Sequence, residues 1–139
     1  MPSPLERLLG SSLAAEPPDE TEFAGLKKSG RARLKDASNA ANSLESRFDL
    51  AYNAAHALCL AALRYRGFRP QNRYIVFQVL PHTLGLGPEV WRVLAKAHEL
   101  RNLGEYEGDL NIDDRIVSDL ISACRTVASK LEGLPPLPR

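Results

Sequence analysis

The sequence predicts an all-α protein, an antiparallel bundle of four or five helices. Apolar side chains recur at intervals of three and four residues through most of the chain, which is the spacing of an amphipathic helix. Glycine and proline separate these segments, and the one β-like run has no second run with which to form a ladder. The 139 residues, of which 44% are hydrophobic and 25% charged, suit one domain with its own core.

We expect the bundle to span residues 20–132. Residues 1–19 contain a short amphipathic piece and then the breaker Pro17-Pro18, so we interpret them as a flexible N-terminal arm. The proline-rich residues 133–139 cannot continue a helix and form a C-terminal tail. The chain is therefore expected to be one helical domain with two short extensions.

The strongest helical pattern lies at residues 43–66 and predicts a central helix. Ser43 and Ser46 are candidate N-terminal caps, and Gly67 supplies a stop that Pro70 reinforces. The apolar positions that repeat at helical spacing are Leu44, Phe48, Ala51, Tyr52, Ala55, Leu58, Cys59, Ala62 and Leu63. Their number predicts that this helix lies in the middle of the bundle.

A first helix precedes the central one and begins at Asp19 or Thr21, both of which suit a helix N-terminus. Phe23 and Leu26 keep the helical spacing. Gly30 weakens the middle of this helix, because glycine there costs about 1 kcal/mol relative to alanine.

Two more helices follow the central one. Pro88 suits the first position of the earlier helix, and Gly104 weakens or ends it. The last helix opens near Asp113 and Asp114, whose carboxylates favour a helix N-terminus, and runs to Leu131. The chain thus has four substantial helices.

Residues 74–80 (YIVFQVL) are open to two interpretations. Their β-branched and aromatic content favours a strand. A lone strand among helices has no ladder partner, however, which favours a short buried helix. We expect the helix, ended by Pro81.

Charge, cysteine spacing and hydropathy exclude several classes of protein. The net charge is +1, with +4 over residues 1–96 and −3 over residues 97–139, so global charge does not favour a dedicated nucleic-acid binder. Cys59 and Cys124 match no metal-ligand or disulfide spacing, so we expect buried thiols, no metal and no cofactor. Without a signal or membrane-spanning segment, we expect a cytoplasmic protein with no membrane contact.

Two groups of cations stand out. The first is a solvated helix face in one interpretation and a phosphate-binding stripe in the other. The second surrounds the turn after the central helix and could border a nucleic-acid groove, although no aromatic residues are interleaved with it. The members are Lys27, Lys28, Arg31, Arg33 and Lys35 in the first group, and Arg64, Arg66, Arg69 and Arg73 in the second.

The candidate functional residues lie in residues 98–108 (HELRNLGEYEG). This stretch places Arg101, Asn102, Glu105 and Tyr106 where a helix ends and a loop begins. A guanidinium beside an amide at such a place can hold a phosphate by bidentate hydrogen bonds. Because Arg101 and Glu105 are four residues apart, an intrahelical ion pair is the structural alternative.

The other candidates also have structural interpretations. Tyr106 can be a packing residue, and Asn102 can cap the helix end. His98 lies one turn before Arg101 and can face the same cleft, although a solvated or packed histidine is favoured. His56 lies within the apolar central helix, where a core or interface histidine is expected.

Two motifs resemble the HEPN superfamily. Residues 48–70 (FDLAYNAAHALCLAALRYRGFRP) are similar to that family's second helix, in which an Ala-Tyr pair and small residues precede an Arg-Gly-Arg-Pro-like turn. Residues 101–109 (RNLGEYEGD), followed by an Asp-led helix, resemble the family's Arg-Asn motif. The resemblance covers about residues 20–131, and the order and spacing of the two motifs make it fairly specific.

The resemblance implies a symmetric homodimer. In active members of the family, an arginine followed by four to six residues and a histidine lines a cleft between the subunits. Many are metal-independent endoribonucleases of toxin–antitoxin or phage-defence systems, and some pair with a small nucleotidyltransferase. The likeness carries over to Arg101 as the motif arginine and Asn102 as the polar residue after it, with the histidine position at Tyr106, Glu107 or Gly108.

This chain departs from the family pattern at the histidine, because no histidine follows His98. A phenol with a pKa of about 10 is ionised about one part in a thousand at pH 7, so Tyr106 is better suited to donate a hydrogen bond than to act as a base. We therefore expect endoribonuclease activity to be altered or lost. Arg101 and Tyr106 are the expected catalytic residues, and Asn102, Glu105 and His98 the expected binding residues.

Three functions are consistent with these residues. The leading expectation is a dimeric component of a toxin–antitoxin or defence system that binds RNA or a nucleotide, with an antitoxin or a nucleotidyltransferase as partner. The alternative is a non-enzymatic interaction or scaffold module. The third is a regulatory domain that binds a small nucleotide without RNA.

Overall fold

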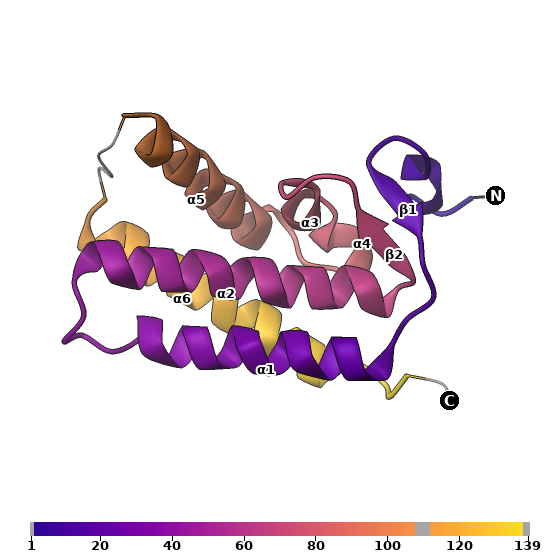
Figure 1. Cartoon of the computed structure of the whole chain (residues 1–139), viewed down its shortest axis with the longest axis horizontal. Coiled ribbons are helices and arrows are strands. Elements are labelled where there is room, and N and C mark those ends of the chain that lie inside the picture. Colours follow the sequence, from indigo (N-terminus) through magenta and orange to yellow (C-terminus); the bar gives the residue numbers. More distant parts are fainter. Residues whose placement is uncertain (1, 108–111, 138–139) are drawn as a thin grey trace.

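The computed structural model describes residues 2–107 and 112–137, with side chains over residues 2–104 and 112–137. The protein is mostly helical, as the sequence predicts, and a small two-stranded sheet lies beside the helices (Figure 1). The elements in chain order are η1 (Glu6–Leu8), β1 (Leu13–Ala15), α1 (Glu20–Ala37), α2 (Leu44–Tyr65), β2 (Phe68–Pro70), α3 (Ile75–Gln78), α4 (Leu80–Thr83), α5 (Pro88–Glu107) and α6 (Asp114–Glu132).

The predicted central helix is α2, and it carries the core. Phe48, Tyr52 and Leu58 are among its fully buried side chains. Helix α1 runs antiparallel beside α2, α6 packs on both, and α5 crosses the far side of α2 at an angle (Figure 1). A helix that is apolar around most of its circumference must be surrounded by other elements, which is the situation of α2.

Gly30 allows α1 to approach α2 closely. A Cβ atom at this position would lie 2.7 Å from both Cγ and Cδ2 of Leu58, which is far inside van der Waals contact. The glycine that the sequence marks as a weak point of the first helix is therefore a point of close packing between two helices.

Three side-chain caps begin the long helices where the sequence predicts. Asp19 accepts a hydrogen bond from the backbone N–H of Glu22 at 3.0 Å, and Ser43 accepts one from Ser46 at 3.1 Å. Asp113 caps α6 in the same way. Each cap satisfies a backbone donor that the first turn of a helix leaves unpaired.

Within the ambiguous residues 74–80, residues 75–78 form the short buried helix that was expected, α3, and Leu80 begins α4. Ile75, Val76 and Phe77 of α3 are buried. The expectation that Pro81 ends the helix is wrong, because Pro81 lies in the first turn of α4. A proline is tolerated there since the first turn makes no use of its missing N–H.

The sheet was not predicted. Strands β1 and β2 pair antiparallel, with Leu13 opposite Pro70 and Ala15 opposite Phe68. Strands of three residues are too short to show a period-two pattern, so the sequence carries no signal for them. Residues 2–19, for which a flexible arm was expected, pack on the bundle in this structure, and Leu5 and Leu13 are buried in the core.

The side chain of Arg64 holds this N-terminal segment against the central helix. Its side chain is 2% exposed. It donates hydrogen bonds to the carbonyl oxygens of Glu16 (2.9 Å) and Pro17 (2.8 Å) and forms an ion pair with Glu22. Arg69 binds the carboxylates of the same two glutamates. The segment is therefore attached through a buried guanidinium of the central helix.

Helix α5 continues through Gly104 to Glu107, past the point at which the sequence allowed it to end. One glycine weakens a helix without stopping it. None of the helices in the described ranges is long and apolar enough to cross a membrane.

Candidate functional site

The candidate site is formed where α2, α3 and α5 meet, and His98 lies at its centre. The Tyr52 hydroxyl lies 2.9 Å from Nδ1 of His98, and the Asn102 amide lies 3.1 Å from Nε2 of the same ring. The first contact joins α2 to α5, whereas the second lies within one turn of α5. Both ring nitrogens of His98 thus have polar contacts, which fix the orientation of the imidazole.

Two proton arrangements satisfy these contacts when the ring is neutral. If the Asn102 amide donates to Nε2, then Nδ1 carries the proton and donates to the Tyr52 oxygen. If the amide is turned to present its oxygen, Nε2–H donates to it and the Tyr52 hydroxyl donates to Nδ1. The ring occupies the same place in both arrangements.

Two guanidiniums lie beside the Tyr52 ring. The Cζ atom of Arg101, on α5, is 4.9 Å from the centre of that ring. The Cζ atom of Arg73, just before α3, is 5.5 Å from it, and an Nη atom of Arg73 donates to Oδ1 of Asn53 at 3.2 Å. Both distances are within the range of cation–π attraction. Tyr52 therefore brings together two cations that are far apart in the sequence.

The pKa of His56 is shifted by its surroundings in the site. The pKa of His56 is lowered to about 4, mainly by burial and to a smaller extent by the positive charge of Arg73, by neighbouring His98 and by Arg101. His56 is consequently neutral near pH 7. The charges of Arg73 and Arg101 lie close enough to His56 to contribute to this shift, although burial is its largest cause.

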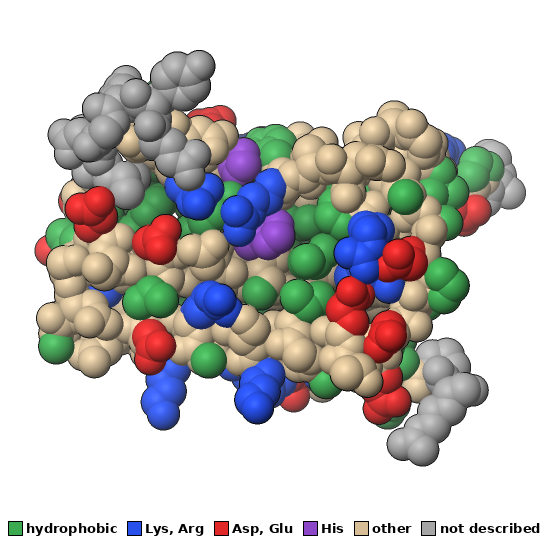
Figure 2. Space-filling view, in the orientation of Figure 1, with side chains coloured by type: hydrophobic (Ala, Val, Ile, Leu, Met, Phe, Trp, Pro, Cys, Tyr) green, Lys and Arg blue, Asp and Glu red, His purple; other side chains and the backbone are tan. Residues whose placement is uncertain are grey.

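Aromatic rings border the cations. The Tyr74 ring is 5.0 Å from the His98 ring at an interplanar angle of 40°. Phe77 lies 6.1 Å from His98 and 6.0 Å from Tyr52. In the space-filling view, histidine side chains lie next to lysine or arginine side chains on the surface over α2 and α5 (Figure 2). Aromatic residues are not interleaved with the cations along the sequence, but the fold places aromatic rings beside them.

The structure brings together three of the five predicted site residues, namely Arg101, Asn102 and His98. The other two, Glu105 and Tyr106, belong to α5, but their side chains lie outside the described residues. The alternative Arg101–Glu105 ion pair lies outside them as well.

Sequence reasoning missed four residues of the site. By sequence, Tyr52 is an apolar position of the central helix, His56 a core or interface histidine, and Tyr74 part of an ambiguous segment. Arg73 belonged to the second basic group, but nothing linked it to α5. Tyr52 and His56 lie one turn apart on the central helix, and this spacing is the feature of the sequence that could have marked them as site residues.

The second basic group separates into two parts. Arg64 and Arg69 are held by Glu16 and Glu22, and Arg66 donates two hydrogen bonds to a backbone carbonyl, at 3.0 and 2.8 Å. These three arginines are structural. Within this group it is Arg73 that reaches the candidate site.

The cysteines show no sign of chemistry. Cys59 and Cys124 are buried, and burial raises the pKa of the Cys124 thiol to about 12 and that of Cys59 well above its usual value. Over residues 2–104 and 112–137, no three His, Cys, Asp or Glu side chains are grouped as metal ligands.

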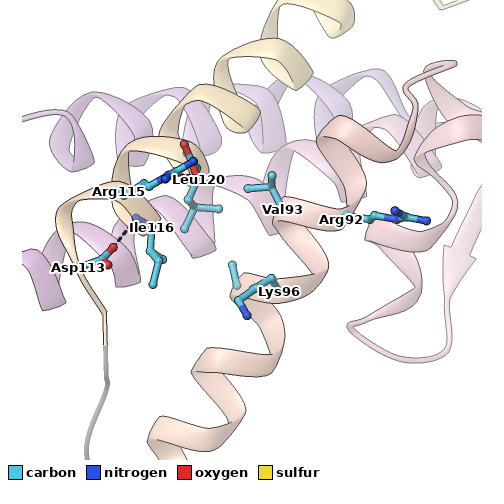
Figure 3. Close-up of a pocket in the computed structure, with 9 residues that line it drawn as sticks. Arg92, Val93, Lys96, Asp113, Arg115, Ile116 and Leu120 are labelled. Carbon is cyan, nitrogen blue, oxygen red and sulfur yellow. Dashed lines mark hydrogen bonds and ion pairs between the residues drawn. The ribbon is translucent and has the colours of Figure 1, made fainter.

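A separate groove lies between α5 and α6. One cavity in it has a volume of about 300 Å³, and an adjoining one of about 270 Å³ shares Val93 and Asp119 with it. Val93 faces Leu120 across the first cavity, whereas Arg92 points away (Figure 3). None of the predicted site residues that the structure describes lines either cavity.

No protein-family model, curated protein or solved structure matches this chain. The features of the chain that bear on function are the geometry around His98 and the two sequence motifs.

Proposed function

We propose that the protein binds RNA or a nucleotide at the cluster around Tyr52. The observation that carries the proposal is the approach of the Arg73 and Arg101 guanidiniums to one buried ring, at 5.5 and 4.9 Å. Guanidiniums form bidentate hydrogen bonds with phosphate. The HEPN resemblance, which marks Arg101 from the sequence, supports the same site.

The neighbouring side chains suit such a ligand. Asn102 is exposed at the border of the cluster, and His98 and Arg101 are half-buried, so a ligand can reach them from solvent. The low pKa of His56 leaves this ring neutral, and it adds no charge of its own near pH 7. The attraction for phosphate therefore comes from the two arginines.

The proposed setting is a cytoplasmic dimer in a toxin–antitoxin or defence system, with an antitoxin or a nucleotidyltransferase as partner. This part of the proposal is supported by the HEPN resemblance alone. RNA cleavage is not part of it. Both ring nitrogens of His98 make polar contacts, so taking a proton from RNA requires one of these contacts to break first.

The proposal is tested by fluorescence anisotropy with a labelled single-stranded RNA and a labelled nucleotide. Charge-assisted hydrogen bonds of about 1.5–3 kcal/mol predict that Arg101→Ala and Arg73→Ala each weaken binding about 10- to 100-fold. Arg115→Ala is the matched control, because it removes an arginine whose side chain is 90% exposed and lies on α6. Unchanged affinity in both site variants would contradict the proposal. Incubation of the same RNA without metal shows whether cleavage accompanies binding.

The groove between α5 and α6 supports a second candidate function, that of a scaffold. Val93, Ile116 and Leu120 give it an apolar lining, and Leu103 of α5 is 52% exposed. Apolar surface of this kind is typical of contacts between protein chains. We expect Val93→Glu to convert a dimer to a monomer in analytical ultracentrifugation without unfolding it. A dimer that persists in this variant excludes the groove as the dimer interface.

A further inference from the structure

The cations that adjoin Arg73 in the sequence are held by the protein itself. Arg64 and Arg69 form ion pairs with glutamates of the N-terminal part of the chain. Arg66 donates two hydrogen bonds to the carbonyl oxygen of Thr83. Of the guanidiniums beside the Tyr52 ring, that of Arg73 comes from the turn after α2 and also donates to Asn53, whereas that of Arg101 comes from α5. Two cations beside one ring suit contact with a single phosphate better than contact with a long backbone.

An aromatic surface lies directly beside these cations. Tyr74 follows Arg73 in the chain, is half-buried, and has its ring 5.0 Å from the ring of His98. His98 is itself oriented by Tyr52 and Asn102. An aromatic side chain held in this way offers a surface on which a nucleobase can stack.

We infer that the site recognises one unpaired nucleotide, whose base stacks on Tyr74 beside His98 and whose phosphate is held by Arg73 and Arg101. This inference rests on the proposed function and narrows it to single-stranded ligands with a short footprint. A base inside a duplex has both faces covered by its neighbours in the stack, so it cannot reach Tyr74. An unpaired base has a face available.

The number of phosphate contacts is measured by the salt dependence of binding. For single strands the slope of log K against log salt concentration is about −0.7 per neutralised phosphate, so one phosphate held by both arginines predicts a slope of about −0.7 per site. We expect this slope with a single-stranded RNA of eight nucleotides, and little gain in affinity per site beyond about two nucleotides. A slope steeper than about −3, or equal affinity for the matching duplex, overturns the inference.

The stacking contact is tested at position 74. Stacking of one base predicts that Tyr74→Ala weakens binding of the single-stranded RNA about 5- to 150-fold. Tyr74→Leu preserves apolar packing without an aromatic face and is expected to show a similar loss, whereas Tyr74→Trp retains affinity. An abasic oligonucleotide should bind Tyr74→Leu and the parent protein equally. Parent-like RNA affinity in the leucine variant, with the fold intact by circular dichroism, overturns the inference.

These outcomes separate the inference from the function on which it rests. If Arg101→Ala and Arg73→Ala lose binding but Tyr74→Leu does not, the site still binds phosphate and the base contact is wrong. If the arginine variants bind RNA and nucleotide as the parent does, the proposed function itself fails.

Discussion

Tyr52 and His98 are joined by a hydrogen bond of 2.9 Å between the phenol oxygen and Nδ1 of the imidazole. This contact connects the centre of α2, which is fully buried, to the half-buried side of α5 that carries Arg101. The hydrogen bond therefore holds His98, at the candidate site, in a fixed position relative to the buried core.

Replacing Tyr52 by phenylalanine tests that connection. The variant loses one partly buried hydrogen bond while it keeps the aromatic ring, so we expect the free energy of unfolding to fall by about 0.5–1.5 kcal/mol. The ring still lies beside Arg73 and Arg101, so RNA affinity should fall less than in Arg101→Ala. Urea denaturation and anisotropy measure the two quantities. Tyr65→Phe is a matched control, since the Tyr65 hydroxyl donates to the carbonyl of Pro135 at an exposed position.

The lowered pKa of His56 predicts that the protein loses stability on acidification. Its pKa is about 4 in the folded protein and about 6.5 when unfolded, so between these values the unfolded chain binds more protons. The free energy of unfolding should therefore fall as the pH drops from about 6.5 to about 4, by about 1–3 kcal/mol after allowance for partial exposure. His56→Gln should flatten this part of the stability curve. A parent protein equally stable at pH 7 and pH 4.5 would contradict the assignment.

Arg64→Ala should be strongly destabilising. It removes a guanidinium that is 2% exposed and leaves Glu22, at 34% exposure, without its buried partner. Glu22 keeps its ion pair with Arg69, but the part-buried carbonyls of Glu16 and Pro17 lose their donor, at a cost of about 1–3 kcal/mol each. Limited proteolysis should show early cleavage in residues 2–15 of this variant. Arg115→Ala, at an exposed position, should change stability by less than about 0.5 kcal/mol.

Two glycines of α1 should respond to alanine with opposite signs. At Gly30 a new Cβ would lie 2.7 Å from Leu58, so we expect Gly30→Ala to lower the free energy of unfolding by about 1–3 kcal/mol. At Gly25 a new Cβ meets nothing within 4 Å, so Gly25→Ala should raise it by about 0.5–1 kcal/mol. Thermal unfolding of the two variants gives the comparison. The same sign at both positions would show that packing at Gly30 does not govern the contact between α1 and α2.

Local sequence features predict the helices and one part of the site. Helical periodicity and the caps Asp19, Ser43 and Asp113 are local features, and they predicted where the long helices begin. His98, Arg101 and Asn102 lie within two turns of one helix, so their proximity was also evident from spacing.

Contacts between segments that are distant in the sequence became known only from the folded structure. Periodicity within a helix does not specify which residue of another helix it meets, so the approach of Tyr52, Arg73 and Tyr74 to α5 was not predictable. The roles of the second basic group were not predictable for the same reason. Arg64 has a structural role because the fold places Glu22 beside it, whereas Arg73 belongs to the site because the fold places Tyr52 beside it. Local sequence specifies secondary structure, whereas the partner of a charged side chain is set by packing.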